Sequence, residues 1–268
     1  MVSYSTPLSD LFIRVKAENR AALIGYLPAG FPSIAHSSRV IAAMVEGGVD
    51  AIEIGFPYSD PVMDGPVIQD AAEQSLKNGT GASDVFDLMA ATTKLGVPAV
   101  VMTYWNPIER YGVEAFAASL KAAGGSGVIT PDLTVEESSQ WSKAAEDSEI
   151  NRIYVVAPST SENRMPLVTS QCSGFIYAAS LMGVTGTRTS VSGDARDLVS
   201  RIRSTSDLPV AVGLGVSNAT QAHEVAAYAD GVIVGSAFIR EVQESATIDE
   251  ACERVRALAS SLAQGVRR

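Results

Sequence analysis

The chain has 268 residues, of which 46% are hydrophobic and 19% charged, so it can bury a sizeable core, and this composition argues against wholesale disorder. Its 20 Lys and Arg against 30 Asp and Glu give a formal net charge of −10, which argues against a nucleic-acid-binding protein, since phosphate backbones attract basic charge. Two cysteines, Cys172 and Cys252, are too few for a disulfide framework or a zinc site. We expect no secretory signal, because Met1–Arg20 has no apolar core followed by a small-residue cleavage site, and no membrane-spanning segment, because no apolar run approaches about 20 residues. These features indicate a globular protein of the cytoplasm.

Near the N-terminus, Leu8, Leu11, Phe12 and Val15 recur at helical spacing, which predicts an amphipathic helix before the first strand. Beyond it, one pattern repeats along the chain: a short β-branched run, a loop, then an amphipathic stretch. The β-branched runs predict strands at Ala22–Tyr26, Ala51–Gly55, Ala99–Thr103, Gly127–Thr130, Arg152–Ala157, Gly174–Ala179, Pro209–Val212 and Gly231–Val234.

Two of the intervening stretches carry clear helix signals. The first is Ser33–Glu46, where apolar residues recur at helical spacing before the Gly47-Gly48 stop. In the second, Thr134 and Glu137 have the spacing of a capping box, which predicts a helix that begins there and continues through Trp141.

Eight strand-and-helix units in about 268 residues are typical of one (β/α)8 barrel, the TIM barrel architecture. No Pro, Gly or Ser-rich linker divides the sequence, so we expect residues 1–268 to form one domain, with the N-terminal helix closing the bottom of the barrel. A doubly wound open sheet is the competing architecture, because it has the same alternation of strands and helices.

Two predicted connections are unusually long and rich in turn residues. Phe56–Gly65 follows the second strand, and Ser180–Gly193 follows the sixth. Because barrel active sites lie in the loops after the strands, both are candidate lids.

Three carboxylates are the first candidates for chemistry. Glu53 lies inside the apolar second strand, where an unpaired carboxylate is costly to bury. It is a structural ion-pair partner, an outward-facing residue at the strand end, or a general acid and base whose pKa is raised by its apolar surroundings. Asp60 and Asp64 follow in the next loop, where they either cap turns or divide proton-donor and proton-acceptor roles with each other.

Glycines cluster after the last three predicted strands. Such loops often bind phosphate through backbone N–H groups at a helix N-terminus, although glycine also ends strands for ordinary turn reasons. The residues are Gly183, Gly186, Gly213, Gly215 and Gly235, the last followed by Ser236.

Amine and metal chemistry are disfavoured by the positions of the lysines and histidines. No lysine falls on a predicted strand, where it could form a Schiff base, and neither His36 nor His223 falls at a strand end, where it could bind a metal. We therefore expect no metal site, and acid–base catalysis on a phosphorylated small molecule.

The run from Glu53 to Gln69, EIGFPYSDPVMDGPVIQ, is similar to the signature of the tryptophan synthase alpha subunit family. The resemblance covers nearly the whole chain and continues through segments that begin at Tyr104, Pro131, Gly183, Gly213 and Gly235. It implies a lyase that cleaves indole-3-glycerol phosphate to indole and glyceraldehyde 3-phosphate by a retro-aldol step, within L-tryptophan biosynthesis.

The resemblance also implies roles for particular residues. Glu53 would move the protons, Asp64 would bind the indole N–H, and Tyr177 would orient the acid–base residue. Thr185 would couple lid closure to the loop of Asp60 and Asp64. The substrate phosphate would bind at Gly186, Gly215, Gly235 and Ser236.

By the same resemblance, the chain carries no cofactor of its own and forms an alpha2beta2 heterotetramer with a beta subunit that holds pyridoxal phosphate. Tyr58 and Met63 stand where many members have Phe and Ala, and Leu181 and Met182 are apolar where some have a basic residue. The alternatives are a stand-alone indole-releasing lyase of secondary metabolism, a catalytically inactive barrel that activates a partner, and a ring-closing synthase. Intact Glu53 and Asp64 argue against the second, and the lack of a strand-end lysine argues against the third.

Overall fold

The computed structural model describes residues 6–180, 193–213 and 215–267, which contain eight strands and twelve helices, with one or two helices after each strand. The strands are β1 (Ala22–Pro28), β2 (Ala51–Gly55), β3 (Ala99–Met102), β4 (Gly127–Thr130), β5 (Asn151–Val156), β6 (Ile176–Ala179), β7 (Val210–Gly213) and β8 (Gly231–Val234). The helices are α1 (Pro7–Ala17), α2 (Ile34–Glu46), α3 (Pro66–Lys77), α4 (Ala82–Thr93), α5 (Trp105–Tyr111), α6 (Val113–Ala122), α7 (Ser139–Asp147), α8 (Met165–Gln171), α9 (Gly193–Arg203), α10 (Ala219–Ala226), α11 (Ser236–Gln243) and α12 (Ile248–Gly265).

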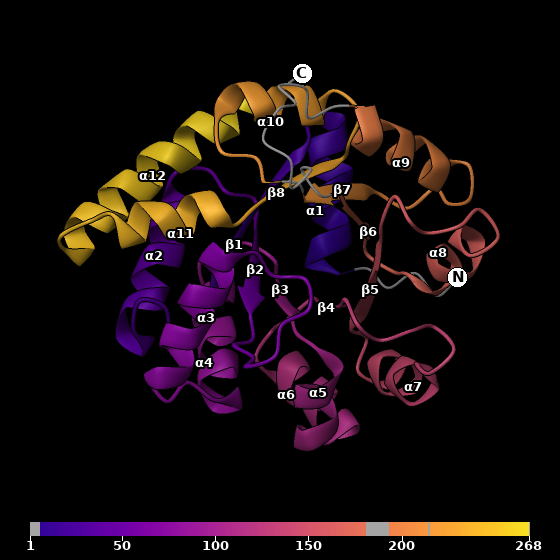
Figure 1. The fold of residues 1–268 in the computed structure, drawn as a ribbon, viewed down its shortest axis with the longest axis horizontal. Coiled ribbons are helices and arrows are strands. Elements are labelled where there is room, and N and C mark those ends of the chain that lie inside the picture. Colours follow the sequence, from indigo (N-terminus) through magenta and orange to yellow (C-terminus); the bar gives the residue numbers. More distant parts are fainter. Residues whose placement is uncertain (1–5, 181–192, 214, 268) are drawn as a thin grey trace.

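The eight strands form a closed parallel barrel. They pair in chain order, and β8 pairs with β1 through a register that sets Ala22 beside Gly231. Figure 1 shows the helices arranged around the strands. The predicted TIM barrel is therefore confirmed and the doubly wound open sheet is excluded, because an open sheet would leave two unpaired edges. Every observed strand end lies within two residues of the predicted one.

The inside of the barrel is filled in layers by the inward side chains of the strands. Ile24, Val100, Ile129 and Ile153 belong to one buried cluster, as expected where alternate side chains of each strand face the axis. The next inward position toward the carboxyl end of a strand is two residues further on. On β2 this position is Glu53, two residues beyond Ala51. The layer of side chains that includes Glu53 is the floor of the barrel mouth.

Helix α1 closes the opposite end of the barrel, as predicted. Thr6 caps it by accepting a hydrogen bond from the Ser9 N–H, and Pro7 occupies its first turn. Its apolar residues lie in the same buried cluster as the barrel interior, and the Phe12 ring packs 5.7 Å from the ring of Phe175. In Figure 1, α1 lies near the centre of the ring of helices. The helix thus covers apolar surface that the short strands would otherwise expose.

The predicted capping box at Thr134 is wrong. Helix α7 begins at Ser139, five residues later than the predicted cap. The Thr134 hydroxyl donates to the Glu137 carboxylate at 3.0 Å, so the two side chains bond to each other in a turn, and neither bonds a helix N–H. The spacing is shared by capping boxes and turns, which is why it misled the prediction.

None of the helices within the described ranges is both long and apolar enough to cross a membrane.

Replacing Phe12 with Ala should lower the free energy of unfolding by about 3–5 kcal/mol, because it leaves a cavity under the barrel. Ile13→Ala is the matched control: Ile13 is the next residue of the same helix but 69% exposed, and its loss should change stability by less than about 0.5 kcal/mol. Urea unfolding of the three proteins measures both values. Equal small effects would show that α1 does not stabilise the barrel.

Candidate active site

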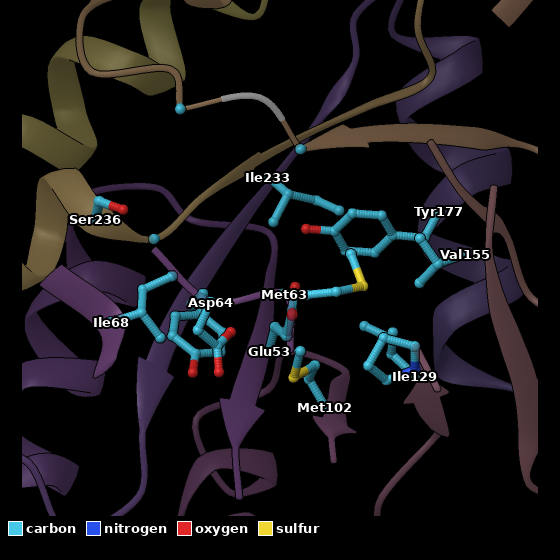
Figure 2. Close-up of a pocket in the computed structure, with 15 residues that line it drawn as sticks. Glu53, Met63, Asp64, Ile68, Met102, Ile129, Val155, Tyr177, Ile233 and Ser236 are labelled. Carbon is cyan, nitrogen blue, oxygen red and sulfur yellow. The ribbon is translucent and has the colours of Figure 1, made fainter. Parts of the chain in front are cut away.

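A cavity of about 130 Å³ opens at the carboxyl ends of the strands. Its wall combines two carboxylates and two tyrosines with apolar side chains and glycines, and Figure 2 shows Glu53, Asp64 and Tyr177 around the same space. The lining residues are Tyr26, Glu53, Met63, Asp64, Ile68, Met102, Ile129, Pro131, Val155, Tyr177, Gly213, Gly215, Ile233, Gly235 and Ser236.

Glu53 stands at the centre of the apolar strand β2. It is 3% exposed and lies beside Tyr26 of β1 and Val100 of β3 in the strand register. Its Oε2 atom makes no hydrogen bond to any residue that the structure describes. Burial, with a smaller contribution from the charge of Asp64, raises the pKa of Glu53 to about 8. Glu53 is therefore protonated at neutral pH, and it can both give and take a proton near that pH.

Asp64 reaches the cavity from the connection between β2 and α3. Gly65 and Pro66 begin α3 directly after it, and the Gln69 side chain donates to the Asp64 backbone carbonyl at 2.7 Å. The Tyr104 hydroxyl donates to Asp64 Oδ2 at 3.2 Å. Burial raises the pKa of Asp64, and the bond from Tyr104 opposes that rise. These contacts hold a second carboxyl close enough to Glu53 to affect its ionisation.

Tyr26 and Tyr177 each extend across a glycine of the neighbouring strand. The Tyr26 hydroxyl lies 2.3 Å from where a Cβ of Gly55 would be, and the Tyr177 hydroxyl lies 2.3 Å from where a Cβ of Gly213 would be. Burial and the nearby carboxylates raise the pKa of both phenols well above the ordinary value. Both hydroxyls therefore keep their protons and remain hydrogen-bond donors.

Glycines form the part of the wall that follows β7 and β8. Gly235 is the N-cap residue of α11, and no side chain at that position accepts a hydrogen bond from the first turn of the helix. The N–H groups of that turn can therefore donate to a bound anion. Ser236 is the first residue of that helix, and Gly215, with a φ of +79°, lies in the loop after β7. Among the described lining residues none is basic, so an anion here would be bound by backbone N–H groups and the helix dipole.

Most of the predicted site residues meet in this cavity: Glu53, Asp64, Tyr177, Gly215, Gly235 and Ser236 all line it. Asp60 does not line it. Its exposed carboxylate accepts a 2.5 Å hydrogen bond from the neighbouring Ser59 hydroxyl. Thr185 and Gly186 lie outside the described residues, as does most of the predicted lid after β6.

Sequence reasoning missed two tyrosines of the site. Tyr26 lines the cavity and Tyr104 bonds Asp64, yet in the sequence Tyr26 fits an apolar strand and Tyr104 fits a family motif, so neither pattern indicates a role in the site. The available signal was register: Tyr26 is two residues beyond Ile24 and therefore faces inward, as Glu53 does two residues beyond Ala51.

The lysines and histidines lie away from the cavity, as predicted. His36 is on α2 and His223 on α10, and the lysines lie on helices or directly after one. Within the described ranges, no three His, Cys, Asp or Glu side chains are grouped in a way that would hold a metal ion.

The sequence matches a profile of the family described as "Tryptophan synthase alpha chain" over residues 12–267. It is 56% identical to the tryptophan synthase alpha chain of Thermobifida fusca over 265 residues, 98% of each chain. A solved tryptophan synthase structure from Mycobacterium tuberculosis is similar with a TM-score of 0.91 and 48% identity, covering 99% of this chain and 100% of that one. The tryptophan synthase subunit alpha of Legionella pneumophila gives a TM-score of 0.89 at 31% identity, over 98% and 99% of the two chains.

The buried Glu53 carboxyl should make stability depend on pH. Its pKa is about 8 in the folded chain against an ordinary 4.5, so ionisation favours the unfolded chain as pH rises from about 4.5 to about 8. Glu53→Gln cannot ionise and should become more stable than the parent protein across that window, by a few kcal/mol at pH 8. Denaturant unfolding of both proteins from pH 5 to pH 9 measures the difference. Parallel pH curves would show that Glu53 is not desolvated.

Proposed function

Because the chain belongs to the tryptophan synthase alpha chain family, we propose that its barrel mouth is where indole-3-glycerol phosphate is cleaved to indole and glyceraldehyde 3-phosphate. The observation that carries the assignment of the site is a buried, unpartnered carboxyl oxygen on Glu53, with Asp64 beside it. This arrangement supplies proton transfer and a counter-charge, the two things that the retro-aldol step needs.

Glu53 is the acid and the base of the proposed reaction. The bond between indole C3 and the first glycerol carbon breaks when C3 gains a proton and the hydroxyl on that carbon loses one. Protonated Glu53 gives its proton to C3, and the resulting carboxylate takes the hydroxyl proton as the C–C bond electrons return to the ring. The aldehyde leaves and Glu53 is protonated again. The raised pKa of Glu53 suits both roles, giving a proton to C3 and taking one from the hydroxyl.

Asp64 is the group that stabilises the charge formed in between. Protonation at C3 makes the ring an indolenine cation with its positive charge at nitrogen, and a carboxylate that accepts the ring N–H opposes that charge. Opposite charges about 4 Å apart at an effective dielectric constant of about 20 attract by about 4 kcal/mol, roughly a thousandfold in rate. The Tyr104 bond and the α3 contacts keep Asp64 in place for this interaction.

Tyr177 and the glycines orient the substrate between these groups. The Tyr177 hydroxyl keeps its proton and lines the same cavity as Glu53, so it supports the acid–base residue as a donor. The substrate phosphate is assigned to Gly215, Gly235 and Ser236, where the uncapped N-terminus of α11 offers N–H groups. Gly186 is assigned to the same phosphate by family resemblance.

The partner is a beta subunit that binds at the barrel mouth. Val62 is 74% exposed and Met63 41% exposed on the loop beside Asp64, an apolar surface that a partner would cover. We assign the chain to an alpha2beta2 heterotetramer in the cytoplasm, with pyridoxal phosphate on the beta subunit and none on this chain. Asp60 and Thr185 are assigned to loop closure, which Asp60's exposed position at the mouth favours.

Glu53→Gln should lower indole formation from indole-3-glycerol phosphate by at least about a thousandfold, since Gln keeps the shape of Glu but transfers no proton. Steady-state indole release is measured with each protein alone and with a beta subunit of a relative, which should raise the parent's rate. Glu253→Gln, a change at an exposed position of α12, is the matched control and should act like the parent. A folded Glu53→Gln variant within tenfold of the parent would refute the assignment.

Gly235→Asp should weaken binding of glycerol phosphate by at least about tenfold, because it puts a carboxylate at the N–H groups assigned to the phosphate. Gly81→Asp adds the same charge at another N-cap, that of α4, where there is room for a Cβ, and should leave binding unchanged. Calorimetric titration gives the dissociation constants. Unchanged binding by folded Gly235→Asp would place the phosphate elsewhere.

A further inference from the structure

We propose that Tyr104 is a positioning residue that fixes the carboxylate of Asp64, and that Tyr58 acts on Asp64 through Tyr104. The inference deepens the proposed function, on which the role of Asp64 rests. Its evidence is a set of contacts that join the connection after β2 to the connection after β3.

The Tyr104 hydroxyl bonds the catalytic loop at two adjacent residues. It accepts a hydrogen bond from the Met63 backbone N–H at 3.2 Å and donates to Asp64 Oδ2, also at 3.2 Å. The direction is fixed by chemistry, because a backbone N–H can only donate and so leaves the phenol proton free for the carboxylate. One hydroxyl therefore holds both the loop backbone and the carboxylate that the loop carries.

Tyr104 is itself held rigidly by the barrel. Its side chain is 2% exposed, and it is the N-cap residue of α5 at the end of β3. The next N–H, that of Trp105, donates to the two carboxylate oxygens of Asp132 at 2.9 and 3.1 Å. Asp132 follows β4 by two residues, so the position of Tyr104 is set by two strands of the scaffold and not by the loop that it holds.

Tyr58 covers Tyr104 from the solvent side. The two rings are tilted by 34° with centroids 5.2 Å apart, and the Tyr58 hydroxyl accepts a hydrogen bond from Asn106 Nδ2 at 3.2 Å. Tyr58 belongs to the loop after β2, and Asn106 to the first turn of α5. The Tyr58 hydroxyl, absent where family members have Phe, therefore ties the same two connections together a second time.

The loop needs this support because it has little packing of its own. Ser59, Asp60, Val62 and Met63 are exposed, and the turn is rich in Pro and Asp. Few buried contacts leave such a segment at the low end of local stability. A carboxylate that must meet a ring nitrogen has little tolerance for displacement, so a rigid donor on the scaffold improves the rate by pre-organisation.

The same contact predicts a change in the pH profile. The titratable groups that face Asp64 are Tyr104 from the connection between β3 and α5, Glu53 from β2, Tyr26 from β1 and Tyr177 from β6. The Tyr104 bond lowers the pKa of Asp64, against the larger effect of burial. Removing the phenol hydroxyl should therefore raise the pKa of Asp64 and move the acid limb of kcat/KM to higher pH.

The test compares Tyr104→Phe, Tyr58→Phe and Tyr58→Ala in indole formation. Tyr104→Phe should lower kcat about tenfold or more, the effect of losing a hydrogen bond to a charged group, with a smaller change in KM. Tyr58→Ala should also lower kcat, and Tyr58→Phe should lower it less. In the double variant, Tyr58→Ala should lower kcat little beyond the effect of Tyr104→Phe alone. Tyr111→Phe, which loses a surface hydroxyl contact with Ser119, is the matched control and should leave kcat unchanged.

A substrate-free measurement separates this proposal from the proposed function. Carbon-13 NMR titration of the Asp64 carboxyl, assigned with Asp64→Asn, should give a higher pKa in Tyr104→Phe than in the parent and the same pKa in Tyr111→Phe. An unchanged Asp64 pKa together with an unchanged acid limb, or additive effects of Tyr58→Ala and Tyr104→Phe, would overturn the positioning role. A parent protein that releases no indole would instead refute the proposed function, whatever the NMR titration gives.

Discussion

A parallel strand can turn a side chain only toward the barrel axis or toward the surrounding helices, and β2 turns Glu53 toward the axis. The layer below it is made of apolar side chains and is covered from beneath by α1, so among the described residues the carboxyl meets an apolar surface on that side. Charging it there is costly, and its pKa rises to about 8 as a result. The proton-transfer capacity of the site thus follows from the same alternation that packs the core. A barrel filled less well at the bottom would hydrate Glu53 and return its pKa toward an ordinary carboxyl value.

Space for a substrate above Glu53 depends on where the neighbouring strands have no side chain. Tyr26 and Tyr177 are large, but each lies flat across a glycine of the next strand, Gly55 and Gly213. Any Cβ at those two positions would meet a phenol oxygen at 2.3 Å and force the ring to shift, into the cavity or into its neighbours. The two glycines therefore determine the positions of the two phenol donors, although Gly55 does not itself line the cavity. The packing of the two tyrosine rings against these glycines therefore also sets where their hydroxyl donors lie.

Periodicity along the chain predicted the eight strands within two residues, since each is a short buried run between turn residues. It also singled out Glu53, because a charged residue in an apolar strand breaks the pattern. It could not identify Tyr26 or Tyr104, since a tyrosine in a buried strand fits the pattern and its hydroxyl partner is set by tertiary contacts. The predicted helix start at Thr134 was wrong for a related reason. The turn that forms determines which group the Thr134 hydroxyl bonds, and in the structure it bonds the Glu137 carboxylate and not a helix N–H.

Charge is distributed in the cavity so that a phosphorylated indole has one favourable direction. Two carboxyls lie at the end formed by β2 and its loop, while the glycines after β7 and β8 offer neutral N–H donors and the positive end of the α11 dipole. A phosphate turned toward Asp64 and Glu53 would face the Asp64 carboxylate and would hold Glu53 even more firmly in its protonated form, with no basic residue among the described lining side chains to offset the repulsion. The reverse orientation puts the anion on N–H donors and the electron-rich ring beside the carboxyls, where positive charge develops. Binding and catalysis therefore select the same pose, in which the anion meets the N–H groups and the positive dipole end of the α11 N-terminus.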